Sequence, residues 1–318
     1  MSRAKKDRLK EGNLFIPLIF SFGAILEDLP LKEFLSDPTK LSNSLRRIQN
    51  YFQVDGVVCY GDTMFIAESL GSKITDNKPP LVKQLDKLTD NFVAALSELP
   101  KTEYITTATE VTKRLRILLP DTILLCLLPG PLTLASQLTG KETSELLNQG
   151  NFINLVSKAT LSMTKALGDA GIDLIIFQEK TMPLLNENTI KVLHRSYAPV
   201  LNTANFYQIS TLLMVEQFQP RNMGYISKIV NGVVLSPRYI PEATENFNKV
   251  SIALPIPLLQ ESRENIEQYL TEHNIMSLVK SSRLFLLITD REIPNNVDRE
   301  QIINGIQTIR DLLKSKTI

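Results

Sequence analysis

Short apolar runs alternate along the chain with longer segments in which apolar residues recur every three or four positions. The short runs, rich in Val, Ile and Leu, are typical of strands buried on both faces of a parallel sheet, and the longer segments are typical of amphipathic helices. The pattern predicts eight strands, at residues 15–20, 56–61, 123–128, 173–178, 209–215, 232–235, 251–256 and 284–289. It predicts helices over residues 37–52, 78–99, 152–171, 186–201, 263–273 and 300–313.

Eight parallel strands that alternate with helices indicate an α/β fold, a single (β/α)8 TIM barrel with the strands inside and the helices outside. No linker or shift in composition divides the chain, so residues 1–318 are expected to form one barrel domain. A doubly wound open sheet is the competing architecture, and a glycine-rich phosphate loop after an early strand would support it. Residues 20–25 and 59–64, at the ends of the first two strands, lack that glycine spacing.

The carboxyl ends of the strands are where such a barrel carries its reactive groups. These positions predict a polar mouth with both signs of charge, made of Asp62, Gln178, Glu179, Glu216, Gln217, Arg238, Tyr239, Asp290 and Arg291. The segment GPLTLASQLTG, residues 130–140, follows the third strand and has the Gly-Pro start of a helix. Free amide groups between Gly130 and Thr133 would favour an anionic or carbonyl-bearing ligand.

Composition and charge narrow the classes of function. Lys and Arg number 35 against 34 Asp and Glu, for a formal net charge of +1, so the charge balance gives no sign of nucleic-acid binding. No apolar run reaches the roughly 18–20 residues of a membrane span, and the basic start lacks a signal-peptide cleavage site. Cys59 and Cys126 lie within apolar strands, which argues against a disulfide framework and predicts a cytoplasmic protein.

Four segments carry a resemblance to a known family. They are DGVVCYGDTMFIAESLG (55–71), GPLTLASQLTG (130–140), AGIDLIIFQE (170–179) and REIPNNVDREQIINGI (291–306). In order and spacing they resemble motifs of the uroporphyrinogen decarboxylase superfamily, which also contains zinc-dependent corrinoid methyltransferases. The resemblance covers most of the chain and implies that Asp62 is the retained catalytic aspartate. It also implies a homodimer.

The chain departs from the decarboxylase pattern at the substrate-binding positions. Two arginines that hold substrate carboxylates in the porphyrinogen decarboxylases are replaced by Phe22 and Leu26. Gln137 stands where that family has a tyrosine, and Asp290 or Arg291 stands near the place of its histidine. A smaller and less charged substrate than a porphyrin is therefore expected.

The chain also departs from the methyltransferase pattern. That branch holds zinc with a His-x-Cys pair and a further cysteine, as the resemblance implies, whereas Met214, Glu216 and Arg291 stand near those places. The only histidines, His194 and His273, lie in helical segments. No metal and no tightly held cofactor is expected, and a corrinoid would have to be carried by a partner protein.

Glu179 and Glu216 end neighbouring strands, and two carboxylates that face one cavity would raise each other's pKa. Three responses stay open: a shared proton, pairing with Arg291, or a hard divalent metal bound together with Asp62. Asp62 is either a functional carboxylate or a cap for the helix that follows it. Arg291 and Arg238 are candidates for bidentate recognition of a substrate carboxylate, with their guanidinium groups in solvent as the alternative.

The sequence thus favours an enzyme, a zinc-independent lyase that removes a carboxylate from a small or aromatic acid bound at the barrel mouth. Asp62 is expected to carry the electrostatic or proton-transfer role, and Arg291 to orient the substrate. A corrinoid-dependent methyltransferase that works with a corrinoid protein is the alternative. A non-catalytic, ligand-binding barrel is the third reading, because most of the family's substrate-binding residues are replaced.

Overall fold

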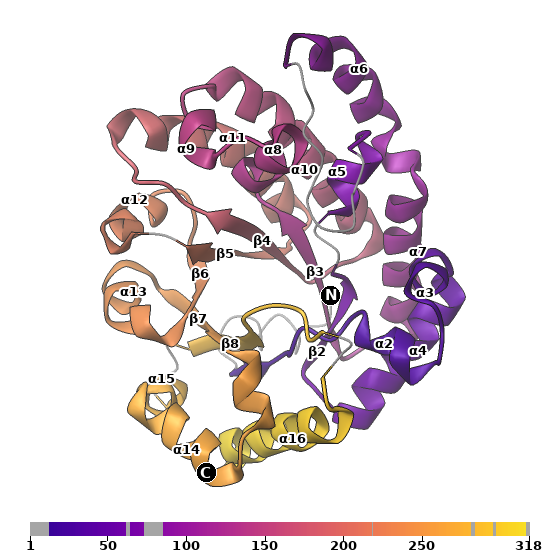
Figure 1. The fold of residues 1–318 in the computed structure, drawn as a ribbon, viewed down its shortest axis with the longest axis vertical. Helices are drawn as coiled ribbons and strands as arrows, with labels where there is room; N and C mark the ends of the chain where they lie inside the picture. The colour runs from indigo at the N-terminus through magenta and orange to yellow at the C-terminus, as the bar shows by residue number, and fades with distance from the viewer. Residues whose placement is uncertain are drawn as a thin grey trace.

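The computed structural model describes residues 13–61, 64–72, 85–217, 219–280, 284–294 and 297–315. Within them, eight parallel strands form a nearly closed barrel surrounded by helices (Figure 1). The strands are β1 (Leu14–Phe15), β2 (Gly56–Tyr60), β3 (Ile123–Pro129), β4 (Leu174–Thr181), β5 (Ser210–Gln217), β6 (Gly232–Leu235), β7 (Lys249–Leu254) and β8 (Leu284–Thr289). Their order in the sheet is β1-β8-β7-β6-β5-β4-β3-β2. The TIM barrel expected from the sequence is confirmed.

The α-helices of the described residues form the outer layer. They are α2 (Phe22–Leu26), α3 (Leu31–Ser36), α4 (Pro38–Phe52), α5 (Phe65–Ser69), α6 (Leu85–Glu98), α7 (Glu103–Leu118), α8 (Pro131–Thr139), α9 (Thr143–Leu146), α10 (Gly150–Ala170), α11 (Glu187–Phe206), α12 (Met223–Ile226), α13 (Ile240–Asn246), α14 (Arg263–Glu272), α15 (Ile275–Lys280) and α16 (Arg299–Ser315). Short 3-10 turns are η1 (Leu99–Lys101), η2 (Pro220–Asn222), η3 (Pro237–Tyr239) and η4 (Ile256–Gln260). Figure 1 shows α16 beside α14 and α4, so the last helix completes the ring. No described helix is long and apolar enough to cross a membrane.

Helix boundaries follow local chemistry. The Asp37 carboxylate accepts hydrogen bonds from the amides of Thr39 and Lys40 and caps α4, whose first residue is Pro38. At α8 the chain turns at Gly130, begins the helix with Pro131 and leaves it through Gly140, which has a left-handed φ of 68°. These two helices therefore start close to where the sequence predicts. The helix expected over residues 186–201 continues to Phe206, and the start of the helix expected over residues 78–99 lies outside the described residues.

The first strand is shorter than the sequence predicts. The ladder of β1 with β8 covers Leu14 and Phe15 only, because Pro17 has no N–H to donate. The chain stays beside β8 through other bonds: the Leu18 amide donates to Thr289 Oγ1 at 3.0 Å. Across the remaining gap, the Phe15 amide donates to Asp55 Oδ2 at 2.8 Å and the Asp55 amide donates to the Phe15 carbonyl at 3.3 Å. These two bonds join the first and second strand segments and nearly close the barrel.

Candidate active site at the barrel mouth

The ends of β4 and β5 separate two environments. Gln178 and Glu216 face the mouth and are hydrogen bonded to each other, Nε2 of the amide donating to Oε1 of the carboxylate. Glu179, the next residue of β4, points to the other side of the sheet, because successive side chains of a strand alternate between its faces. It lies among α8 and α11 instead of in the mouth.

The Glu179 carboxylate fills the N-terminus of α8. It is fully buried, and its oxygens accept hydrogen bonds from the Leu132 amide at 3.2 Å, the Thr133 amide at 2.7 Å and the Tyr197 hydroxyl at 2.7 Å. Burial raises the pKa of Glu179, and these hydrogen bonds oppose the rise. The amide groups expected to be free for a ligand are therefore taken by the chain itself, and that part of the prediction is wrong.

The predicted pair of carboxylates in one cavity is also wrong. Glu179 and Glu216 lie on opposite sides of the barrel wall, so neither a proton shared between them nor a metal held by both is compatible with the structure. The reason is the register of the two strands. At the end of β4 the mouth-facing residues are Gln178 and Lys180, so Glu179 between them faces outward, whereas at the end of β5 Glu216 itself faces the mouth. Pairing of a carboxylate with Arg291, the second of the three responses, stays compatible with the structure, because Arg291 lines the same cavities as Glu216.

Two cavities of the mouth share Glu216 and Arg291 in their walls. The larger has a volume of about 390 Å3 and is lined by Leu18, Phe20, Ser21, Leu35, Gly61, Leu127, Gln178, Lys180, Glu216, Arg291 and Glu292. The smaller has a volume of about 280 Å3 and is lined by Met214, Val215, Glu216, Val234, Leu235, Ser236, Ala253, Pro255, Tyr269, Asp290 and Arg291. Both combine apolar walls with a few charged groups, the usual make-up of a small-molecule site.

The charges of the mouth influence one another. Burial raises the pKa of Glu216 above its ordinary value, with Lys180 and Arg291 opposing the rise and Asp290 adding to it. Burial also raises the pKa of Asp290, and Arg291 is the main opposing charge. Oδ1 of Asp290 is buried without a hydrogen-bond partner in the described part of the chain. The mouth therefore holds two carboxyl groups that take up protons more readily than usual, beside two cations.

The other predicted site residues have different places. Thr133 is buried at α8 and its hydroxyl accepts a hydrogen bond from the Lys180 amide at 2.9 Å. Gln137 is buried, and its Nε2 donates to Met64 Sδ at 3.0 Å. Phe22 is 1% exposed and belongs to the core, not to the lining of the two mouth cavities. Arg238 and Tyr239 line a separate cavity.

Two of the predicted residues lie wholly or partly outside the described part of the chain. Asp62 lies outside the described residues, although Gly61 before it lines the larger mouth cavity. The side chain of Leu26 also lies outside them. The catalytic role of Asp62 therefore stays a prediction.

Lys180 is a mouth residue that the sequence analysis missed. The predicted strand ended at residue 178, whereas β4 runs to Thr181. The signal was present in the alternation of the segment FQEKT, which puts Gln178 and Lys180 on one face. Extending the strand by that alternation would have placed a second cation in the mouth.

The described residues do not fit the zinc of the methyltransferase branch. They contain no group of three or more His, Cys, Asp and Glu side chains that could hold a metal ion. Cys59 and Cys126 are fully buried, and burial raises the pKa of Cys59 to about 12, so its thiolate is strongly disfavoured. His194 is exposed on α11, and His273 packs against the Tyr269 ring with centroids 4.3 Å apart.

Comparison with known proteins agrees with the fold and the motifs. The family model for uroporphyrinogen decarboxylase matches residues 21–198. The chain belongs to this family as a divergent member, which confirms the resemblance seen in the sequence. No curated protein matches the sequence.

Solved structures share the barrel at low sequence identity. A methyltransferase from Methanosarcina mazei has a TM-score of 0.71 and 14% identity, over 94% of this chain and 91% of its own. A B12-independent methionine synthase from Shewanella sp. W3-18-1 has a TM-score of 0.58 and 13% identity, over 90% of each chain. A putative vitamin-B12-independent methionine synthase from Listeria monocytogenes has a TM-score of 0.54 and 10% identity, over 96% of each chain. At these low identities, the similarity of the three structures to this chain shows a shared fold.

Proposed function

We propose that the protein is a metal-independent lyase that binds a small or aromatic carboxylic acid in the barrel mouth and releases its carboxylate as carbon dioxide. The observation that supports this is the larger mouth cavity, where Lys180 and Arg291 stand among the apolar walls of Leu18, Phe20 and Leu127. Lys180 and Arg291 are the groups that can bind a carboxylate, with Glu216 and Glu292 in the same lining, and the apolar walls favour an organic body. The volume of about 390 Å3 suits a molecule the size of a substituted benzoate.

Each group has a role in the proposed reaction. Arg291 and Lys180 orient the substrate carboxylate. A proton is added to the carbon that bears the carboxylate, the bond to the carboxylate breaks, and its electron pair returns to the substrate as carbon dioxide leaves. Asp62 stabilises the protonated, cationic intermediate or supplies the proton. Glu216 lies in the same cavity and keeps its own proton to a higher pH than usual, because burial raises its pKa.

The test is the release of labelled carbon dioxide from a panel of carboxyl-labelled aromatic acids. For an acid that is turned over, we expect Arg291→Met to raise KM about tenfold or more, since it removes a charge-assisted contact. Asp62→Asn should lower kcat by about a hundredfold or more. Arg195→Met is the matched control, because Arg195 is exposed on α11, away from the mouth. Turnover that is unchanged in Asp62→Asn contradicts the catalytic role of Asp62.

Methyl transfer is the second candidate, and the likeness in fold to a methyltransferase over nearly the whole chain favours it. A corrinoid would then be carried by a partner protein that docks over the barrel mouth, with no zinc held by the described residues. Exchange of methyl groups between methylcobalamin and an acceptor, without release of carbon dioxide, would support this function over decarboxylation. Binding of a carboxylic acid with neither reaction would support a ligand-binding barrel.

A further inference from the structure

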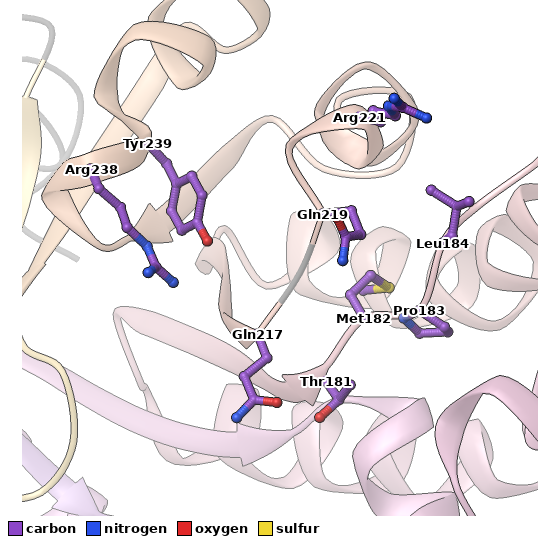
Figure 2. Close-up of a pocket in the computed structure, with 9 residues that line it drawn as sticks. All are labelled: Thr181, Met182, Pro183, Leu184, Gln217, Gln219, Arg221, Arg238 and Tyr239. Carbon is purple, nitrogen blue, oxygen red and sulfur yellow. The ribbon is translucent and has the colours of Figure 1, made fainter.

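A cavity outside the mouth opens beside the ends of β4 and β5, between η2 and η3 (Figure 2). Its volume is about 560 Å3, larger than either mouth cavity. We call it the rim pocket, and its walls include Met182, Leu184, Gln217, Arg221, Arg238 and Tyr239. Its size is within the range of ligand sites in proteins, roughly 300–1,000 Å3.

The rim pocket and the mouth lie on different sides of the same two strands. Lys180 and Glu216 line the larger mouth cavity, whereas Thr181 and Gln217, the next residues of β4 and β5, line the rim pocket. Alternation of side chains along a strand explains this division. A ligand in the rim pocket would therefore contact none of the groups assigned to the proposed reaction.

The rim pocket is positively charged. Arg221 and Arg238 are the charged residues of its lining, and in the described part of the chain neither guanidinium has a carboxylate within 4.0 Å. The Arg238 guanidinium lies over the Tyr239 ring, 4.6 Å from its centroid, which restricts its orientation while leaving its N–H edge available. Figure 2 shows Arg238 and Tyr239 on one side of the pocket and Arg221 across from them, with Gln219 between the two sides in this view.

The wall that carries Arg221 and Leu184 is held in place by a buried amide. Asn222 is 0% exposed; its Nδ2 donates to the Pro183 carbonyl at 2.8 Å and its Oδ1 accepts from the Leu185 amide at 2.9 Å. These bonds tie the loop after β4 to η2, which carries Arg221. The pocket is therefore formed before any ligand arrives, which lowers the entropic cost of binding.

We propose that the rim pocket binds a small organic dianion, a phosphate monoester or a dicarboxylate, separately from the mouth. Arg221 and Arg238 supply two positive charges and fork-shaped donors that match phosphate and carboxylate oxygens. Tyr239, Met182 and Leu184 supply a surface for the organic body, and the Gln217 amide supplies a further polar contact. The site is independent of the proposed decarboxylation, because it shares no lining residue with the mouth cavities.

The test is titration calorimetry with phenyl phosphate and with phthalate, in an Arg291→Met background that disables the mouth. We expect at least one of the two dianions to bind, and the comparison between them tells a phosphate site from a dicarboxylate site. Arg238→Met and Arg221→Met should each weaken binding about tenfold or more, because each removes charge-assisted hydrogen bonds. The matched control, Arg195→Met, should leave the affinity unchanged.

Two further measurements complete the test. Phenol, which has the ring of phenyl phosphate without its charge, should not bind. Asn222→Ala should weaken binding of the dianion while circular dichroism shows a folded barrel. The proposal would be overturned if neither dianion bound. It would also be overturned if Arg221→Met and Arg238→Met both bound the dianion as tightly as their parent, or if phenol bound as tightly as phenyl phosphate.

Discussion

Glu179 and Glu216 stand at the ends of neighbouring strands, and their surroundings give them different chemistry. Glu179 is enclosed by protein and bonded to the start of α8 and to Tyr197. Glu216 is solvent accessible in the mouth, beside Gln178 and within the field of Arg291. The first carboxylate is therefore part of the scaffold, and the second is available to a ligand.

Truncation of the buried carboxylate should destabilise the fold. Glu179→Ala leaves the Leu132 and Thr133 amides and the Tyr197 hydroxyl without their acceptor, and we expect a loss of about 3 kcal/mol in the free energy of unfolding. Tyr197→Phe removes only one of these donors and should cost about 1 kcal/mol. Urea denaturation measures both. A loss below about 0.5 kcal/mol for Glu179→Ala, the size typical of surface substitutions, would contradict the role as a buried cap.

The raised pKa of Glu216 should make binding of a carboxylic acid depend on pH. Below that pKa the side chain is neutral and leaves Lys180 and Arg291 to the ligand; above it, the negative charge of Glu216 competes for them. Affinity for benzoate should therefore fall severalfold between about pH 5 and pH 8, where benzoate itself is ionised. The affinity of Glu216→Gln for benzoate should depend less steeply on pH. Some dependence should remain, because the pKa of the neighbouring Asp290 is raised as well. Equal slopes in calorimetric titrations of both proteins would exclude Glu216 as the titrating group.

At the scale of elements, α8 depends on how closely it approaches β4. A Cβ at Gly130 would lie 2.5 Å from the Tyr197 hydroxyl and closer still to the Glu179 carboxylate. The φ and ψ of Gly130, −68° and 164°, suit any residue, so the cost of a substitution is steric. Gly130→Ala is expected to lower the free energy of unfolding by about 2–4 kcal/mol.

Gly224→Ala is the matched control for this substitution. The nearest atom to a Cβ at Gly224 is Asn246 Oδ1 at 3.7 Å, an ordinary contact, so its free energy of unfolding should change little. If thermal denaturation gave the same midpoint for Gly130→Ala and Gly224→Ala, the close packing between α8 and Glu179 would be contradicted.

The order of strands and helices was predictable because hydrophobic periodicity reports burial directly. All eight expected strands are present, and the single barrel follows from their alternation with helices. Strand ends were less predictable, since polar residues such as Lys180 and Glu216 continue the ladders of β4 and β5 without adding apolar signal. A shift of one residue at such an end decides whether a side chain enters the mouth, as it does for Glu179. The rim pocket depends on loop contacts through Asn222, which no periodicity encodes.

At the scale of the molecule, closure of the barrel depends on Asp55. Its carboxylate accepts the Phe15 amide in the gap between the first and second strand segments. Asp55→Ala should lower the free energy of unfolding by about 1–3 kcal/mol and speed hydrogen exchange of the Phe15 amide. The control Asp121→Ala alters an exposed acid just before β3 and should change neither quantity. Unchanged exchange at Phe15 in Asp55→Ala would contradict the role of this bond in closure.

The proposed function places a small carboxylate in the mouth, and a crystal structure with bound benzoate tests this most directly. The structure predicts the benzoate carboxylate between the Arg291 guanidinium and Lys180 Nζ, and the ring against Phe20 and Leu127, with Glu179 still bonded to α8. A benzoate that displaces Glu179 from the start of α8, or that binds only outside the two mouth cavities, would contradict the account.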